Sequence, residues 1–379
     1  MIAYLDHAAT TPLRPEAVAA MLPFLSERFG NPSGSHSVAR SARLAVDEAR
    51  EVVAATLGAE PGEVVFTGGG TEADNLALAG VIAERGGVPV CTAVEHHAVL
   101  HACLAHGGEV VAVGSDAVVD LDALAAALER LGERASVVSV MLANNEVGTV
   151  EPLAEVVSLV HQRAPRALVH TDAVQAFPWL DVATLTATAD LVSVSAHKFG
   201  GPKGVGALVA RGDVRLRPIL HGGGQERDRR SGTHNVAGIV GMAAAAEATA
   251  ASRPETVARV GSLRDRLADG LLGAGLSATE TGRRETKVAG NCHLRFPGTE
   301  SEALLVLLDE LGVCASAGSA CASGAIEASH VLLAMGLSSE EASSSIRFSL
   351  GATTTPDEVE LALTAVPKAV GQLRIAAEP

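Results

Sequence analysis

Short β-branched runs alternate with longer helical patterns between residues 63 and 210, and this alternation limits the fold more than any other feature. Strands that alternate with helices predict a mostly parallel sheet with helices on both faces. In such sheets, ligands bind at the carboxyl ends of the strands. We expect strands at residues 63–66, 88–92, 109–113, 136–142, 167–171, 190–195 and 206–210, and helices between several of them, at residues 71–84, 121–131 and 152–163.

The pattern changes near Pro254, where a second and smaller set of elements begins. A helical stretch at residues 255–272 leads towards a helix at residues 302–311, whose start resembles a capping box from Thr299 to Glu302. We therefore predict an α/β fold with a large domain and a smaller α+β domain. The predicted large domain is residues 13–253, and the smaller domain is residues 1–12 together with residues 254–379.

The composition excludes several classes of function. The 379 residues include 44 acidic and 29 basic ones, and this net charge of −15 disfavours binding to nucleic acid or to an anionic membrane. Aromatic residues make up only 2 %, too few for stacking platforms for single-stranded nucleic acid. The N-terminus lacks a signal-peptide pattern, and the Ala-rich run at residues 238–251 is too short to span a bilayer. Five cysteines without C-x-x-C spacing fit free thiols, so we expect a cytoplasmic protein.

A glycine-rich turn follows the first strand of the predicted sheet and opens a helix. It reads Thr67-Gly68-Gly69-Gly70-Thr71-Glu72. Glycines allow close backbone approach to an anion, and a helix N-terminus offers N–H groups and a positive dipole end. The turn lacks the Gly-Lys-Ser/Thr ending of a P-loop. Gly70 and Thr71 are therefore candidates for a phosphate site, with a plain turn capped by Thr71 as the alternative.

Two further strand ends carry charged side chains. Asp172 leaves an apolar strand, where a carboxylate is costly unless a cation meets it, although it could equally cap a following helix. Lys198 follows another strand end, together with Ser195 and His197. A phosphate cradle, a carboxylate and a lysine at one edge match pyridoxal phosphate. The cradle would bind the phosphate, the carboxylate would pair with the pyridine nitrogen, and the lysine would form a Schiff base with the aldehyde.

Other side chains at the same edge suit a cofactor and a substrate. His96 could lie flat on the cofactor ring and move protons. The histidines near it have no matching set of ligands, so we predict no metal site. Asn145 offers polar contacts to the cofactor hydroxyl. Arg347 lies in an apolar strand, where it either clamps a substrate carboxylate or forms an internal salt bridge.

Residues 315–324 are all small, and Cys321 is the one cysteine among them. Small residues predict a mobile loop, and nothing bulky surrounds the thiol. We interpret Cys321 as an accessible and mobile functional thiol, with an incidental thiol in a flexible loop as the alternative.

With these residues in hand, the chain resembles a cysteine desulfurase of the class V branch of fold-type I pyridoxal phosphate enzymes. The long SAGSAC segment resembles the group that serves iron–sulfur assembly and tRNA thiolation. The resemblance runs nearly end to end and rests on YLDHAATTP, NPS, TGGGTEADN, EHHAVL, NNEVGT, TDAVQ, SAHKFGGPKG, GGGQERDRRSGTHN, SAGSAC and SIRFSLG.

The resemblance implies a role for each matching residue. Lys198 would bind the cofactor aldehyde, and Cys321 would attack the sulfur of bound L-cysteine, leaving a persulfide and alanine. The other implied roles are pairing with the pyridinium (Asp172), a bond to the ring hydroxyl (Gln175), ring stacking (His96), contact near the hydroxyl and the substrate (Asn145), phosphate binding (Gly70, Thr71, Ser195 and His197), the phosphate of a neighbouring subunit in a homodimer (Thr233), and the substrate carboxylate (Arg347 with Asn31).

The resemblance also implies a sulfur-acceptor protein as partner, such as an iron–sulfur scaffold or a tRNA thiolation enzyme. Cys321 could then ligate an iron–sulfur cluster transiently with that partner. A selenocysteine lyase or an aminotransferase on the same scaffold stays open as an alternative, and so does a catalytically silent scaffold. The chain departs from the family pattern at Gly34, Asp228, His234 and Ala328, none of which is a catalytic position.

Overall fold

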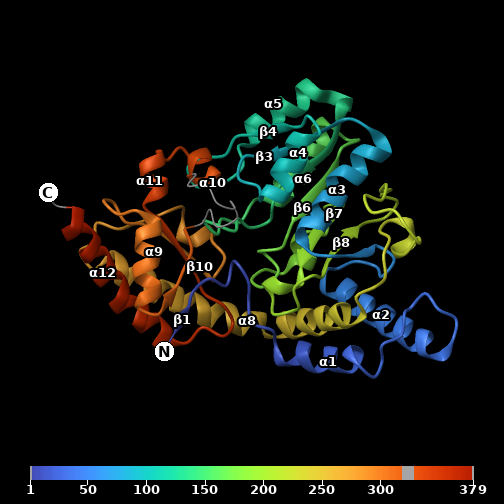
Figure 1. The fold of residues 1–379 in the computed structure, drawn as a ribbon. Coiled ribbons are helices and arrows are strands. Elements are labelled where there is room, and N and C mark those ends of the chain that lie inside the picture. The colour runs from blue at the N-terminus through green and yellow to red at the C-terminus, as the bar shows by residue number, and fades with distance from the viewer. Residues whose placement is uncertain (1, 318–327, 378–379) are drawn as a thin grey trace.

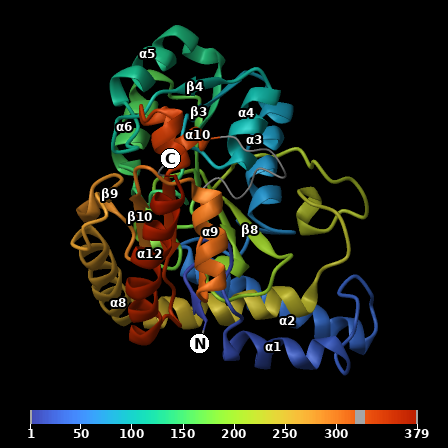
Figure 2. The ribbon, with the colours of Figure 1, turned by 60° about the vertical axis from the view of Figure 1, so that its left-hand side comes forward.

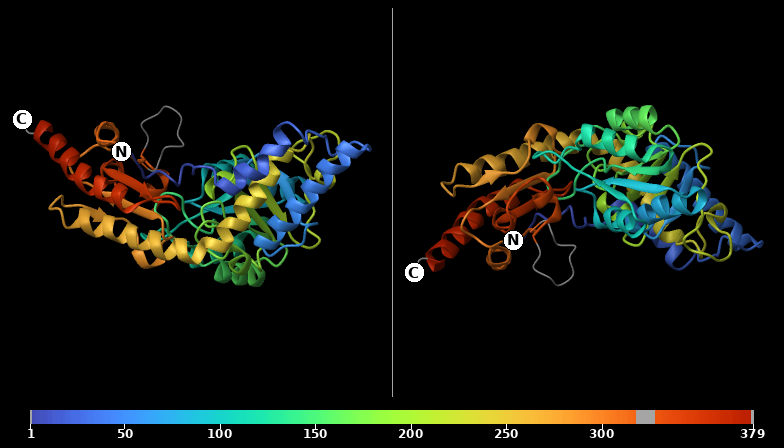
Figure 3. Two further views of the ribbon diagram at one scale, coloured as in Figure 1. Left: turned by 90° about the horizontal axis from the view of Figure 1, so that it is seen from below. Right: turned by 90° about the horizontal axis from the view of Figure 1, so that it is seen from above.

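The computed structural model describes residues 2–317 and 328–377 and has a large and a small part (Figure 1). Views along the vertical show the two parts side by side in an elongated molecule (Figure 3). The large part contains β2 (Val64–Thr67), β3 (Val88–Thr92), β4 (Glu109–Val111), β5 (Ala135–Ser139), β6 (Leu168–Asp172), β7 (Leu191–Ser195) and β8 (Gly206–Ala210). Its helices are α1 (Pro15–Leu25), α2 (Ser37–Thr56), α3 (Gly70–Arg85), α4 (His97–Ala105), α5 (Leu121–Leu131), α6 (Leu153–Arg163) and α7 (Val182–Leu185).

The seven strands of the large part form one sheet in the order β2-β8-β7-β6-β5-β3-β4. The pairs from β7 to β4 are parallel, whereas β8 runs antiparallel to both β2 and β7. The predicted mostly parallel sheet and α/β fold class are therefore confirmed. Because β8 is antiparallel to both of its neighbours, β2 and β7 run in the same direction, so β2 is aligned with the parallel strands.

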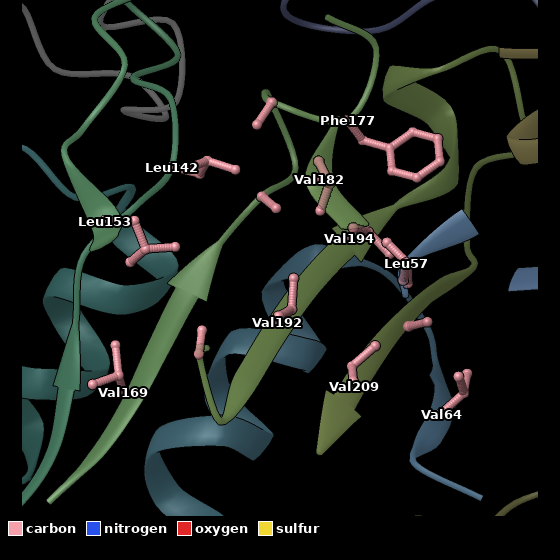
Figure 4. Close-up of a cluster of buried hydrophobic side chains, with 14 of the residues drawn as sticks. Leu57, Val64, Leu142, Leu153, Val169, Phe177, Val182, Val192, Val194 and Val209 are labelled. Carbon is pink, nitrogen blue, oxygen red and sulfur yellow. The ribbon is translucent and has the colours of Figure 1, made fainter. Parts of the chain in front are cut away.

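Neighbouring residues of each strand pack into different cores, as the two-residue period of a strand requires. Val192, Val194 and Val209 face a core that α2, α6 and α8 cover (Figure 4). Leu191 and Leu208 face the other core, which α3 and α4 cover. Burial on both faces explains why the strands read as continuous apolar runs rather than as alternating ones.

The small part has a core of its own, which β1, β10, β12, α9 and α12 share. Figure 2 shows α9 and α12 side by side, on the side of the molecule that faces the viewer. One sheet has the order β12-β10-β9, and β1 pairs in parallel with β11. The bounds are β1 (Ala3–Tyr4), β9 (Thr279–Glu280), β10 (Asn291–Arg295), β11 (Val313–Cys314), β12 (Ser345–Ser349), α9 (Ser301–Glu310), α10 (His330–Ala334), α11 (Ser339–Ser343) and α12 (Pro356–Ala377).

Two expectations about helix starts were wrong. Helix α8 (Val236–Leu272) runs without interruption through Pro254, so the expected start at residue 255 lies inside one helix that extends along both parts. Helix α9 has no side-chain cap, because the Thr299 hydroxyl donates to the Phe296 carbonyl at 2.7 Å rather than to the helix start.

The first residues of the chain contact both parts. The Leu5 N–H donates to the Cys314 carbonyl at 2.9 Å in the small part, and the Thr11 N–H donates to the His197 carbonyl at 3.0 Å in the large part. The separate cores agree with two domains, but the boundaries at residues 12/13 and 253/254 stay a prediction.

Three consecutive residues, Glu226, Arg227 and Asp228, have φ angles of 48°, 58° and 64°. This left-handed conformation is costly for residues other than glycine. The family pattern that the chain resembles commonly has glycine at the position of Asp228, and glycine adopts this conformation at little cost. The conformation is held by Glu226, a buried carboxylate that accepts from both terminal nitrogens of Arg50 at 2.6 and 2.7 Å and contacts His234 Nε2 at 2.7 Å. His234, another departure from the family pattern, is thus part of this network.

We predict that Arg50→Met lowers the free energy of unfolding by about 3 kcal/mol, because it leaves a buried carboxylate without its cation. Urea denaturation at neutral pH measures this loss. Arg166→Met is the matched control, since the ion pair of Arg166 with Glu133 is exposed and should contribute less than about 1 kcal/mol. Equal losses in the two variants would contradict the stabilising role of the buried pair.

The ion pair of Arg50 and Glu226 also makes the free energy of unfolding depend on pH. Burial alone would raise the pKa of Glu226, but bonds from His234 and Arg50 outweigh it and lower the pKa from 4.5 to about 2. A carboxyl with a lowered pKa stabilises the folded state above its unfolded pKa and loses that effect as the pH falls towards the folded value. The difference between wild type and Arg50→Met should therefore shrink between about pH 4.5 and pH 2.

Candidate active site

Strand β8 brings two distant turns to the same edge of the sheet. Gly206 at its start pairs with Thr67 of β2 on one side and with Ser195 of β7 on the other. A Cβ on Gly206 would lie 2.7 Å from the Val194 carbonyl oxygen and 2.8 Å from the Gly69 carbonyl carbon, so only glycine fits. The glycine-rich turn after β2 and the lysine turn after β7 therefore lie side by side.

A cavity of about 650 Å³ lies at this edge, within the usual size of a small-ligand site. Most of the predicted site residues line it. They are Gly70, Thr71, His96, Asn145, Asp172, Gln175, Ser195, His197, Lys198 and Arg347. The carboxyl ends of β2, β3, β5, β6 and β7, or the turns that follow them, supply most of these residues, as the parallel-sheet rule predicts.

The glycine-rich turn has the form of an anion cradle. Helix α3 begins at Gly70 with Gly69 as its N-cap, so Thr71 lies in the first turn, and the alternative of a plain turn capped by Thr71 is wrong. The first N–H groups of a helix have no partner within it and point towards such a cavity. A Cβ on Gly70 would lie 2.9 Å from Val174 Cγ2, so any side chain here would have to displace Val174. The cradle fits the phosphate of pyridoxal phosphate.

Three buried carboxyl groups, those of Asp74, Glu95 and Asp172, lie near the same edge of the sheet, and burial disfavours their charged forms. Burial raises the pKa of Asp172 to about 6, and an N–H bond from Val174 at 2.8 Å opposes this shift. Burial and the charge of Asp172 raise the pKa of Asp74, and burial raises that of Glu95. Asp74 and Asp172 both line the cavity, and of these two Asp172, with a pKa of about 6, stays largely ionised at neutral pH. A protonated pyridine nitrogen is the kind of cation that would satisfy it.

Lys198 ends a short helical turn, Ala196–Lys198, directly after β7. Its Nζ donates to the Ala8 carbonyl at 2.5 Å and to the Ala9 carbonyl at 3.0 Å. Sequence reasoning assigned no role to these two residues, although it noted the segment around them as part of a motif. The N-terminal segment therefore forms one wall of the cavity and orients the lysine.

His96 has a defined tautomer. Its Nδ1 accepts the Ala98 N–H at 3.1 Å, so the neutral ring carries its proton on Nε2. Burial, and then the charge of Lys198, lower the pKa of His96 to about 4. At neutral pH the ring is thus uncharged, as suits a group that lies against a cofactor and donates or accepts a proton.

The two asparagines after β5 divide their tasks. Asn144 Oδ1 accepts the N–H groups of Glu146 and Val147 at 2.8 and 3.0 Å, which makes it a turn residue. Asn145 lines the cavity instead. Gln175 Nε2 donates to the Ala8 carbonyl at 2.7 Å and thereby ties the turn after β6 to the N-terminal segment.

Arg347 joins the small part to the cavity. Its guanidinium donates to Asp6 at 2.8 Å and to the Asn145 carbonyl at 2.9 Å, so the internal salt bridge considered from the sequence is present. Its Nε is buried and has no hydrogen-bond partner among the residues that the structure describes. The salt bridge therefore leaves a donor that could still serve a substrate carboxylate.

Three predicted site residues are not part of this cavity. Thr233 and Asn31 are exposed and do not line it, and Asn31 Oδ1 accepts the Ser33 N–H at 3.0 Å. Cys321 lies outside the described residues. The roles of these three residues stay predictions.

The chain on either side of residues 318–327 is bonded close to the cavity. The Arg347 N–H donates to the Ser316 carbonyl at 2.7 Å. At the other end, the Ser329 hydroxyl donates to the buried Glu146 carboxylate at 2.5 Å, and His330 Nε2 lies 3.0 Å from the Glu95 carbonyl. Ala328, a departure from the family pattern, packs against an apolar cluster beside them.

No group of three or more possible metal ligands occurs in residues 2–317 and 328–377. Over the same ranges, no helix has the length and apolar character that crossing a bilayer would require.

Ser329→Ala should loosen α10, because it removes the N-cap of that helix and leaves a Glu146 oxygen buried without its donor. We expect a loss of about 2 kcal/mol in local stability, seen as faster hydrogen exchange of the amides of α10. Ser338→Ala is the matched control, since Ser338 caps the exposed helix α11. It should leave exchange in α10 unchanged. Unaltered α10 exchange in Ser329→Ala would refute the anchoring role.

Comparison with known proteins identifies the family of the chain. The family model described as aminotransferase class-V matches residues 3–362. An IscS-like cysteine desulfurase of Mycobacterium tuberculosis is 46 % identical over 99 % of this chain and 98 % of its own length. A solved structure titled NifS-like protein has a TM-score of 0.90 at 36 % identity and covers 98 % of this chain and 100 % of its own. A structure titled SspA in complex with cysteine is 31 % identical, with a TM-score of 0.78 over 93 % of this chain and 99 % of its own.

The family match spans nearly the whole chain, and the relatives match it from end to end. Enzymes of this family use pyridoxal phosphate, for which the cradle, Asp172 and Lys198 form a fitting set of groups. The chain belongs to the aminotransferase class-V family.

Proposed function

We propose that this protein is a pyridoxal phosphate-dependent cysteine desulfurase. It removes sulfur from L-cysteine and gives L-alanine and a persulfide on Cys321. The observation that carries the proposal is the convergence of Lys198, Asp172 and the N-terminus of α3 on one cavity. Relatives named cysteine desulfurase, and a related structure whose title includes cysteine, support the choice of substrate.

Different residues of the cavity would bind different parts of the cofactor. The N-terminus of α3 with Thr71, and Ser195 and His197 across from it, would hold the phosphate. Asp172 would pair with the pyridine nitrogen, Gln175 would meet the ring hydroxyl, and Lys198 would bind the aldehyde. When bound, pyridoxal phosphate withdraws electrons from the substrate and so weakens its bond from Cβ to sulfur.

Other residues would bind the substrate and move its protons. Arg347 would hold the carboxylate with its remaining donor, and Asn145 would lie beside it. Lys198 would take and return protons at the substrate carbons. His96 would donate or accept one through Nε2, because its Nδ1 is already used by Ala98.

Cys321 would act as the nucleophile. Its thiolate forms a bond to the substrate sulfur while the bond from that sulfur to Cβ breaks, and the electron pair passes to the carbon side. After protonation, one thiol and L-cysteine have become one persulfide and L-alanine, so no outside oxidant is needed. Chain connectivity allows this step, since Cys321 follows Ser316 by five residues, a span of at most about 18 Å.

The persulfide would pass to an acceptor protein, of the iron–sulfur scaffold or tRNA thiolation type. We place this exchange in the cytoplasm. The four cysteines that the structure describes, Cys91, Cys103, Cys292 and Cys314, are all unpaired, as expected in a reducing compartment.

In a homodimer, Thr233 and Asn31 could contribute to the active site of the partner subunit. Both lie outside the cavity of their own chain, so each would act on the cavity of the partner. Support comes from a stripe on α1 and the turn after it, where Val18, Leu22, Leu25 and Phe29 are spaced by three to four residues and are 40 to 75 % exposed. An apolar stripe of this kind typically marks a protein interface.

Cys321→Ala should keep the visible absorption of bound cofactor but form no persulfide from radiolabelled cysteine. Lys198→Ala should lose turnover altogether, because the cofactor aldehyde and the substrate protons have lost their amine. Labelling of the protein in Cys321→Ala would show that another residue accepts the sulfur. Colourless wild-type protein that stays colourless with added pyridoxal phosphate would refute the proposed function. Selenide release from selenocysteine, measured in parallel, tests the selenocysteine lyase alternative.

Leu22→Glu combined with Leu25→Glu should convert the dimer to a monomer, because two charges would have to be buried in the interface. Light scattering after size exclusion measures the mass. Val306→Glu is the control, because Val306 is 61 % exposed on α9, close to the 57 % of Leu22, but lies away from the stripe. A monomeric wild type, or a dimeric double variant, would remove the proposed interface.

A further inference from the structure

A second cavity, of about 230 Å³, adjoins the Lys198 cavity. The two share Ala8, Asn145, Gln175 and Lys198 as walls. Neither the phosphate cradle nor Asp172 lines the second cavity, so the proposed cofactor site does not account for it. Its size suits a ligand of several heavy atoms rather than a large one.

Both parts of the molecule contribute to the second cavity. The large part supplies the turn before α1 and Trp179, and the small part supplies residues after β12. Helix α8, which extends along both parts, adds Thr249, Arg253 and Thr256 (Figure 1).

The charges around the second cavity favour an anion. Arg14, Lys198 and Arg253 line it, and Glu16 is the acidic residue that lines it within the described chain. Arg14 is partly used, since its Nε donates to the Phe199 carbonyl at 3.3 Å and its Nη2 donates to Ser252 at 3.4 Å. Lys198 faces the Ala8 and Ala9 carbonyls. Arg253 is therefore the group best able to bind a ligand here.

Arg253 has unused donors. Its guanidinium lies 5.5 Å from the centre of the Phe177 ring, which supports it from one side. Its Nε and one terminal nitrogen are buried and have no hydrogen-bond partner among residues 2–317 and 328–377. Buried donors are normally satisfied, and this pair has the fork geometry that a carboxylate matches with its two oxygens.

The remaining walls suit a short apolar body. Trp179, Val288 and Leu350 line the second cavity, and Val288 and Leu350 are almost fully buried. Asn291 also lines it, and its buried Oδ1 has no partner in the described part of the chain. This oxygen would accept a hydrogen bond from a ligand N–H, O–H or water.

We propose that the second cavity binds a small monocarboxylate of about three or four carbons, with its carboxylate on Arg253 and its apolar body against Trp179. This inference does not depend on the proposed function. Two sources share the chemistry: amino acids such as alanine and cysteine, and acids without an amine, such as propionate and pyruvate. The Asn291 oxygen would favour the amino acids through their ammonium group.

The protein carries its own probe for this cavity, because Trp179 is the one tryptophan in the sequence. Titrating the holoenzyme with propionate should change the tryptophan fluorescence in a saturable way. Propionamide, which has the same body without the charge, should not. Separate titrations with alanine and pyruvate distinguish the two sources. The absorption of the bound cofactor, recorded in the same titrations, reports the Lys198 cavity, so the propionate signal should appear without a shift of that band.

Arg253→Gln should weaken the apparent propionate affinity at least about tenfold, since the charged fork is lost. Arg266→Gln is the matched control on the same helix, where Arg266 pairs with Glu360 at the surface, and it should bind as wild type does. Arg253→Lys keeps the charge without the fork and should lie between wild type and Arg253→Gln, which separates binding from a folding defect. A fluorescence response that is absent in wild type, unchanged in Arg253→Gln, or matched by a shift of the cofactor band would overturn the proposal.

Discussion

The antiparallel insertion of β8 between β2 and β7 is the constraint on which the rest of the site depends. It gives β2 the direction of the parallel strands, so the turn after β2 opens at the same edge as the turn after β7. Gly206 holds both turns at one level, where no side chain would fit. A phosphate cradle and a lysine that lie more than a hundred residues apart in the chain thereby become neighbours.

Burial then decides the charge of the groups at this edge. Asp74, Glu95 and Asp172 are almost fully buried, and burial favours their neutral forms. His96 is kept neutral by the same burial. Asp172 nevertheless stays largely ionised at neutral pH, with a pKa of about 6, so a protonated pyridine ring would complement its buried charge.

The interface between the two parts brings together the residues to which we assign substrate chemistry. Arg347 of β12 reaches Asp6 and Asn145, and Glu146 binds Ser329, so both ends of the segment with Cys321 are attached near the cavity. The second cavity lies at the same junction and adds an arginine with unused donors. Two adjoining pockets that share the Lys198 wall would allow a small acid to bind beside the reacting groups.

The sequence by itself determined the parallel sheet, the glycine-rich turn and the strand-end residues Asp172 and Lys198, because the alternation of β-branched runs with helical patterns, glycine content and charge at strand ends can be read from short stretches of the chain. It missed the carbonyls of Ala8 and Ala9 on Lys198, the absent cap of α9 and the unbroken course of α8. Only the tertiary structure decided that Arg347 pairs with Asp6 and that Arg253 and Trp179 share a cavity. The physical reason is that such contacts join residues far apart along the chain, and their geometry depends on how the two parts pack and not on local preference.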